Sequence, residues 1–331
     1  MRTFLAPVFL VSLLSLPLGG CSGSAEPTPS RRVAAPASAA PLAPARSIDL
    51  DGDPALHEAR PSQATDFFVW TREGEERAVT YHLDAQGRQV EALDGIVIAT
   101  SAGTWQWQLE DRAVPTVPCE YYDDEGHVFA GEPVEPGAAT RASLRHLASG
   151  AEQVLVDPGV DLMGNADVKH DVGVIASVGP YIFVEESTYA NTCGAHGNTG
   201  VSAMIWNAAT GMMVAMPTDV GPLEAPRGAA IEGLTDNDDD DDIFAPTEEN
   251  LEVTELVPRF ARDGSLELGL QFTAPTCYAC TRGGWSSYTK STVVDAVAMP
   301  ALLAAFASPP PAVRAFLRGH PEIEMKGWSA R

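Results

Sequence analysis

The chain has 331 residues, 45% of them hydrophobic, and a formal net charge of −24 at pH 7. This length suffices for one large domain or two modest domains with a real core. Such a negative charge repels nucleic acids and anionic membrane surfaces but attracts cationic proteins and divalent cations. Composition therefore argues against a nucleic-acid partner and leaves a cationic partner open.

The N-terminus has the pattern of an export signal. Arg2 precedes an apolar run that is too short for a stable membrane span. The sequence LGGC at 18–21 resembles the lipobox of bacterial lipoproteins, in which the signal is cut before the cysteine and that cysteine receives the lipid. The resemblance implies a signal peptide over 1–20 and lipidation of Cys21. Because Ser22 follows instead of Asp, it also implies the outer membrane; an ordinary export signal is the alternative.

Residues 21–47 are rich in Ala, Pro and Ser and lack apolar periodicity, which predicts a disordered tether. Residues 48–150 are predicted to form a β-rich N-terminal domain, because turn signals separate short runs rich in β-branched and aromatic residues. Trp105 and Trp107 share one strand face and are expected to be core aromatics. RASLRHLASG (141–150) is predicted to be a short helix that ends at Gly150.

Residues 151–331 are predicted to form an α+β C-terminal domain. Strand-like runs include VGVIASVG, YIFVEESTYA, VSAMIWNAA, LEVTELVPRF, SLELGLQFTA and STVVDAV. Two helices, MPALLAAFA and PPAVRAFLRG, are expected near the end of the chain, the second with proline at its start and Gly319 just past its end. The predicted class is α+β, with mostly antiparallel sheets and a few short helices.

Four cysteines besides Cys21 predict two disulfides in an exported protein, with three possible pairings. Cys277 and Cys280 have the CxxC spacing of redox proteins, but no helix-like apolar period follows them, and a redox cysteine of that type needs a helix N-terminus. We therefore favour structural disulfides, with Cys119 paired to Cys193 and Cys277 paired to Cys280.

Two acidic segments are candidate calcium sites. In the run 236–242 the candidate ligands are Asp238, Asp240 and Asp242, but consecutive side chains point in different directions, which favours a solvated loop. In the other segment, Asp49, Asp51 and Asp53 alternate as converging ligands do, yet the glycine and the terminal acid of a calcium loop are misplaced. We expect no cofactor, with calcium as the alternative.

Signatures of known catalytic sites are few. The seven histidines lack HExxH spacing, and no GxSxG, Walker or GxGxxG pattern occurs. Ser287 and Lys290 match SxxK by letter, but their surroundings favour a strand over the required helix start. Sequence patterns therefore favour a protein that is not an enzyme.

The segment NTCGAHGNTG (191–200) is predicted to be a binding turn made of Gly194, Ala195, His196 and Gly197. Gly194, Gly197 and Gly200 allow the positive φ that a tight connection between strands needs. His196 is the only catalytic candidate, as a general base, and the alternative is a histidine that packs on the turn.

Around this turn, residues 168–306 resemble an extracytoplasmic domain found in the anti-sigma factor RsiV and in the peptidoglycan deacetylase PdaC. The turn itself, CGAH at 193–196, carries the resemblance, with Cys193 in place of the family's first glycine. The resemblance implies an α+β extracytoplasmic module, and in RsiV that module binds lysozyme. It does not extend to sigma-factor control or deacetylation, because the matching segments are missing here.

Together these features predict a non-enzymatic, lipid-anchored envelope protein that binds a cationic envelope protein such as a lysozyme, or that has a structural role. The membrane contact would be the N-terminal lipid, and the outer membrane is the expected location. A cell-wall hydrolase that uses His196 and a calcium-binding surface protein are the alternatives.

Overall fold

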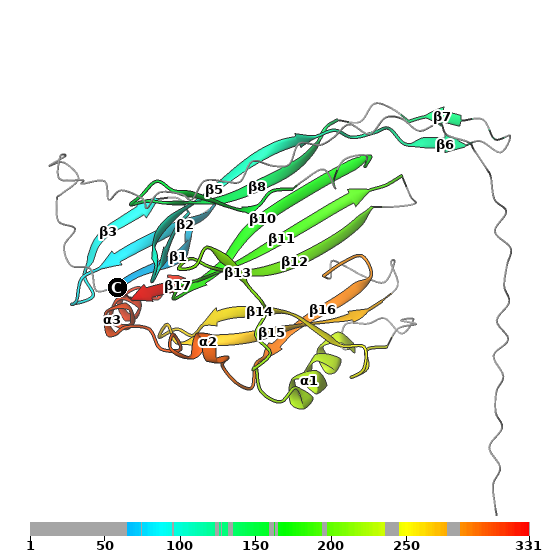
Figure 1. Cartoon of the computed structure of the whole chain (residues 1–331). Coiled ribbons are helices and arrows are strands. Elements are labelled where there is room, and N and C mark those ends of the chain that lie inside the picture. The colour runs from blue at the N-terminus through cyan, green and yellow to red at the C-terminus, as the bar shows by residue number, and fades with distance from the viewer. Residues whose placement is uncertain are drawn as a thin grey trace, which may run out of the picture. The chain divides into compact units, whose positions relative to one another are not determined.

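The computed structural model describes residues 65–330 apart from positions 74, 95, 123–125, 127, 132–134, 159–161, 163–164, 194–196, 236–244 and 277–284. The described residues belong to one compact unit, Ala55–Arg331. The predicted signal peptide and tether lie outside the described residues. Among the helices that are described, none is long and apolar enough to cross a membrane. The fold is α+β and mostly antiparallel, as predicted (Figure 1).

The largest element of the described fold is a 12-stranded sheet, whose main path runs β13-β12-β11-β10-β17-β1-β2-β3. Strands β4, β5, β8 and β9 branch from this path, because β8 pairs with β10. The strand bounds are β1 (Thr65–Glu73), β2 (Glu75–Leu83), β3 (Gln89–Asp94), β4 (Val97–Thr100), β5 (Gly103–Val114), β8 (Gly137–His146), β9 (Glu152–Val156), β10 (Asp167–Val178), β11 (Tyr181–Asn191), β12 (Asn198–Asn207), β13 (Met212–Val214) and β17 (Glu324–Ala330).

The branch folds over one face of β10–β12 and encloses a core there. Trp105 and Trp107 of β5 are 5% and 6% exposed and pack in this core with Trp206 of β12, which confirms their predicted role. Trp105 and Trp206 meet edge to face, with ring centroids 5.3 Å apart. Aromatic pairs in this geometry stabilise a core beyond the area that they bury.

The helix predicted over 141–150 is wrong. Residues 141–146 belong to β8, which pairs with β5 along its whole length and also with β9 and β10. Ala142 and Leu144 are fully buried on one strand face. A central strand gains more from these pairings and from burial than the short helix gains from propensity, so tertiary context decides.

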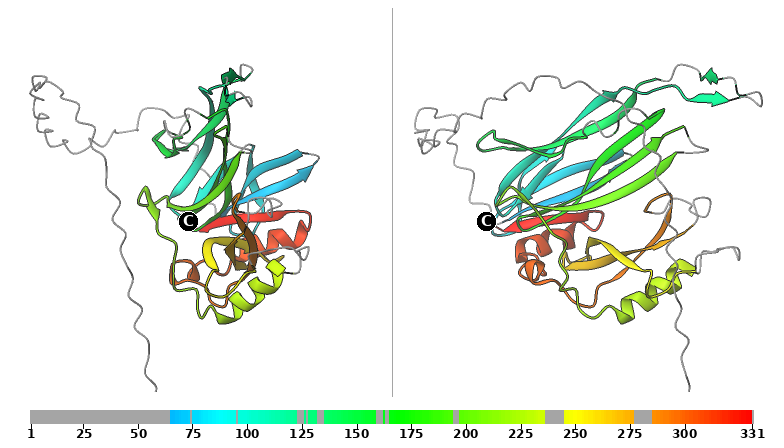
Figure 2. Two further views of the ribbon diagram at one scale, coloured as in Figure 1. Left: turned by 90° about the vertical axis from the view of Figure 1, so that its right-hand side faces the viewer. Right: turned by 45° about the vertical axis from the view of Figure 1, so that its right-hand side comes forward.

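A three-stranded sheet lies under the other face of β10–β12 and separates that face from α1 (Glu224–Thr235), as Figure 2 shows. Its strands are β14 (Glu252–Phe260), β15 (Leu266–Pro275) and β16 (Thr289–Asp295). Leu270 and Phe272 are fully buried and share one core with Phe183 of β11 and with Leu303 of α2 (Ala301–Ala304). A separate two-stranded ribbon consists of β6 (Glu120–Tyr122) and β7 (Val128–Ala130).

Strands from both sides of residue 150 share the large sheet. β1, near the start of the described chain, pairs antiparallel with β17 at its end, and Thr65 lies opposite Ala330. Helix α3 (Pro311–Gly319) covers this junction through Val313, Phe316 and Leu317. The proline at its start is as predicted, whereas Gly319 is the last helical residue and His320 is the C-cap.

Candidate functional site

Many residues singled out in the sequence lie outside the described part of the chain. They are Cys21, Asp49, Asp51, Asp53, Gly194, Ala195, His196, Asp238, Asp240, Asp242, Cys277 and Cys280. Cys119, Cys193 and Gly197 are described. Cys193 and Gly197 lie between β11 and β12, and Cys119 is joined to Cys193 by a disulfide. The candidate site is therefore built around the β11–β12 hairpin.

A disulfide joins Cys193 to Cys119, with their Cα atoms 5.2 Å apart, as the sequence predicts. Cys119 directly precedes β6, so the bond ties the β6–β7 region to the end of the β11–β12 hairpin. The two cysteines are 74 positions apart in the chain. Closing so long a loop removes much of the conformational freedom of the unfolded chain.

The backbone of the turn departs from the prediction. Gly197 and Gly200 do not have positive φ, whereas Cys193 has a φ of 64° and is the only described non-glycine residue in that region. The side-chain oxygen Oδ1 of Asn191 accepts a hydrogen bond from the backbone N–H of Cys193, at 2.9 Å. Gly197 is needed for space instead, because a Cβ there would lie 2.4 Å from the ring of Tyr189.

The first part of β12, which β13 does not cover, forms hydrogen bonds with the segment that leads into β16. The backbone N–H of Val201 donates to the carbonyl of Trp285 at 2.9 Å, and that of Ser287 donates to the carbonyl of Thr199 at 3.0 Å. The N–H of Thr199 donates to the hydroxyl of Ser287 at 2.7 Å. Ser287 of the SxxK match thus supports the hairpin, and Lys290 lies on β16, in agreement with the predicted strand.

One face of the hairpin carries a chain of polar contacts. Imidazole Nε2 of His170 lies 2.7 Å from Oε1 of Glu186, and the hydroxyl of Ser202 donates to Oε2 of Glu186 at 3.2 Å. The backbone N–H of Thr140 donates to Nδ1 of His170 at 3.2 Å. Because Nδ1 accepts a hydrogen bond, the neutral imidazole carries its proton on Nε2. This N–H donates a hydrogen bond to Oε1 of Glu186.

These three side chains are not arranged as a serine nucleophile, a histidine base and a supporting carboxylate. In a serine triad the imidazole contacts the hydroxyl, whereas here the carboxylate of Glu186 lies between Ser202 and His170. Both ring nitrogens of His170 are engaged, and its side chain is 1% exposed. The arrangement connects β8, β10, β11 and β12 and fits a structural role for His170.

The other face of the hairpin carries a carboxyl pair between the two sheets. Glu185 of β11 faces Glu255 of β14, which is 5% exposed and whose Oε1 has no hydrogen-bond partner among the described residues. Burial, with a smaller contribution from the negative charge of Glu185, raises the pKa of Glu255 to about 7. Glu255 is therefore protonated below neutral pH, and this buried acid is the one strongly perturbed carboxyl among the described residues.

Exposed acidic residues occur on α1 and near the start of β14. Between residues 171 and 258 the chain has sixteen acidic side chains and a single basic one, Arg227. The exposed acids of this stretch on α1 and near the start of β14, which we call the α1 acidic surface, are Glu224, Glu232, Glu248, Glu249 and Glu252. Leu251, between these acids, is buried in the same core cluster as Ala230 and Leu234 of α1.

Sequence reasoning missed His170, Glu186 and Glu255. The two consecutive glutamates inside the apolar run YIFVEESTYA were a visible signal, since charged residues within a central strand need a partner or a special reason. Among the described residues, no three His, Cys, Asp or Glu side chains gather as metal ligands do. The sequence matches no protein-family model, and no curated protein is similar to it.

Proposed function

We propose that the protein is a lipid-anchored protein of the cell envelope whose folded part binds a cationic envelope protein, such as a lysozyme, without catalysing a reaction. The α1 acidic surface carries this proposal. A surface with five exposed acids, on a stretch with one basic residue, attracts a cationic partner and speeds its approach.

The hairpin and the sequence support the proposal in two further ways. The disulfide and the contacts of Thr199 tie the strands of the β11–β12 hairpin to neighbouring segments, and preorganised surfaces lose less entropy on binding. The lipobox at 18–21 and the resemblance of the CGAH turn to the extracytoplasmic domain of RsiV favour an exported binding module.

The test is a binding measurement with a cationic lysozyme as probe and the mature protein immobilised. We expect saturable binding at about 20 mM salt that weakens strongly at about 300 mM, because a Debye length of about 10 Å at 0.1 M screens exposed charges. Succinylated lysozyme, which has lost its positive charge, is expected not to bind. Equal binding of both forms, or no binding of native lysozyme at low salt, contradicts the proposal.

A pair of matched variants locates the surface. Glu224→Gln with Glu232→Gln removes two charges from the α1 acidic surface, whereas Glu267→Gln with Glu322→Gln removes two exposed charges elsewhere. We expect the first variant to bind about fivefold more weakly and the second to bind as the wild type does, because exposed charges contribute about 0.5 kcal/mol each. Equal weakening in both variants would show that only net charge matters.

A further inference from the structure

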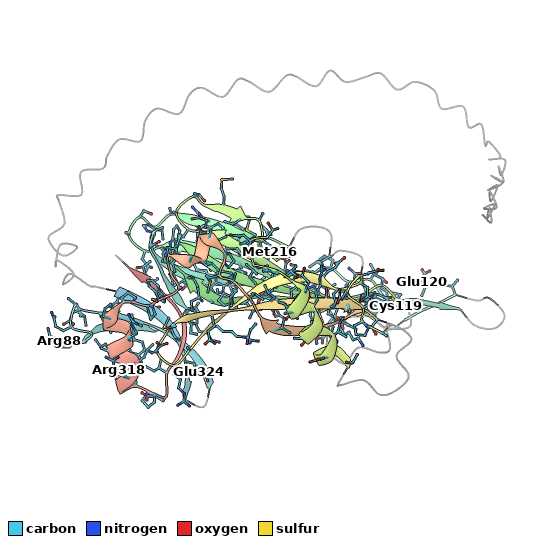
Figure 3. All side chains as sticks on the ribbon, turned by 90° about the horizontal axis from the view of Figure 1, so that it is seen from below. Arg88, Cys119, Glu120, Met216, Arg318 and Glu324 are labelled. Carbon is cyan, nitrogen blue, oxygen red and sulfur yellow. A yellow bond between two sulfur atoms is a disulfide. The ribbon has the colours of Figure 1, made fainter. Side chains whose placement is uncertain are left out.

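A cleft with a volume of about 480 Å³ opens between the end of β14 and the start of β17, at the C-terminal end of α3. It is distinct from the hairpin site. Figure 3 shows Glu324 of β17 and Arg318 of α3 at this end of the compact unit, away from Cys119. Clefts of about 300–1,000 Å³ are the usual size for small-molecule sites in proteins.

Apolar residues form part of the inner wall of the cleft. Pro258 of β14, Leu317 of α3 and Met325 of β17 are buried and line it, with Leu317 and Met325 only 5% and 8% exposed. Phe260 and Ile323 are half-buried and complete the walls. The parts of Phe260 and Ile323 that remain accessible can take up a short hydrocarbon group from water.

The rim of the cleft is positively charged. Arg259 and Arg262 are exposed, Lys326 is half-buried, and Glu324 is the one acid among the described lining residues. The whole chain has a net charge of −24, so the charge around the cleft is opposite in sign to that of the protein as a whole. The ion pair of Arg259 with Asp295, at 3.4 Å between exposed side chains, is of the weak surface kind.

The turn that carries Arg262 is well ordered by hydrogen bonds. The N–H of Gly264 donates to the carbonyl of Ala261 at 2.8 Å, and the N–H of Ser265 donates to Oδ1 of Asp263 at 3.0 Å. Gly264 has a φ of 83°, and a Cβ there would lie 2.9 Å from Leu317 under the cleft. The turn therefore fixes the backbone of Arg262 at the edge of the cleft.

We propose that this cleft binds a small anionic amphiphile, with a carboxylate or phosphate head at Arg262 and Lys326 and an apolar chain against Phe260 and Ile323. The guanidinium and ammonium groups supply charge-assisted hydrogen bonds to such a head. A free lipid phosphate and a fatty carboxylate share this chemistry, and the probes below distinguish them.

Isothermal titration of the mature protein with octyl phosphate, octanoate and octylammonium, all below their micelle concentrations, tests the proposal. We expect one saturable site for at least one anionic probe and no binding of octylammonium. The anion that binds more tightly identifies the head group. Equal binding of octylammonium, or the absence of heat for both anions up to millimolar concentration, overturns the proposal.

Three variants place the site. Arg262→Ala and Lys326→Met are each expected to weaken the tighter anion about fivefold, since each removes one charge-assisted contact. Arg318→Ala removes an exposed cation of α3 that does not line the cleft, and it is expected to leave the affinity unchanged. Unchanged affinity in both cleft variants, or an equal loss in Arg318→Ala, overturns the assignment. A thermal melt of each variant confirms that it is folded.

Discussion

At the scale of single residues, the least expected group is Glu255. Its carboxyl lies between two sheets, Oε1 has no hydrogen-bond partner in the part of the chain that the structure describes, and the nearby carboxyl of Glu185 carries the same charge. Burying such a group in the ionised form is unfavourable, and the raised pKa of about 7 expresses this. In the unfolded chain, by contrast, the carboxyl is hydrated and releases this proton near pH 4.5, as an ordinary glutamate does.

The substitution Glu255→Gln tests this interpretation. Between pH 4.5 and 7 the folded state keeps a proton that the unfolded state has released, so the carboxyl lowers stability progressively as pH rises through this window. We therefore expect Glu255→Gln to match the wild type near pH 4.5 and to be about 2 to 3 kcal/mol more stable at pH 8. Urea unfolding at the two pH values measures the difference.

Glu185→Gln is the matched control for this prediction. It removes the like charge but leaves Glu255 buried, so a gain at pH 8 of the same sign and smaller size is expected, since Glu185 is the lesser cause of the shift. A difference between Glu255→Gln and the wild type that stays constant from pH 4.5 to pH 8 would contradict the assigned pKa.

At the scale of elements, the β11–β12 hairpin combines a strained residue with a covalent tie. Cys193 has a left-handed backbone conformation that glycine adopts more readily than other residues. A side chain in this region costs about 1 kcal/mol, and the disulfide to Cys119 offsets it. The sequence favoured this pairing, but it placed the positive φ on the neighbouring glycines.

The effect of Cys193→Gly on the stability of the protein is expected to have opposite signs under oxidising and reducing conditions. Under oxidising conditions the variant loses the disulfide and about 4 kcal/mol of stability, given a loop that spans 74 positions. With reductant present, the wild type has no disulfide either, and the glycine variant is expected to be more stable by about 0.5 to 1 kcal/mol. Urea unfolding of both proteins, with and without reductant, gives the two differences. A variant that is less stable under both conditions would show that Cys193 is not strained.

At the scale of the whole molecule, residues on both sides of position 150 form one sheet and one compact unit. The pairings of β1 with β17 and of β8 with β10 connect the two predicted domains. Neither half keeps its sheet complete without the other, so the unit is expected to unfold cooperatively.

Urea unfolding followed by tryptophan fluorescence and by far-UV circular dichroism should give one coincident transition. Trp105 and Trp107 report on the N-terminal half and Trp206 and Trp328 on the C-terminal half, so single-tryptophan variants separate the two signals. Coincident midpoints are expected because the shared sheet couples the halves. Two separate midpoints would instead support independent domains with a boundary near residue 150.

Local sequence pattern was sufficient to predict the α+β class, most strands, the proline-initiated helix α3, the core position of Trp105 and Trp107, and the favoured disulfide. Periodicity and turn chemistry are properties of neighbouring residues. Packing between distant segments, by contrast, sets the strand at 141–146, the pairing of β1 with β17, the burial of Glu255 near Glu185 and the group of cations around the cleft. These features depend on which distant segments pack together, because burial and pairing over the whole chain outweigh local preference.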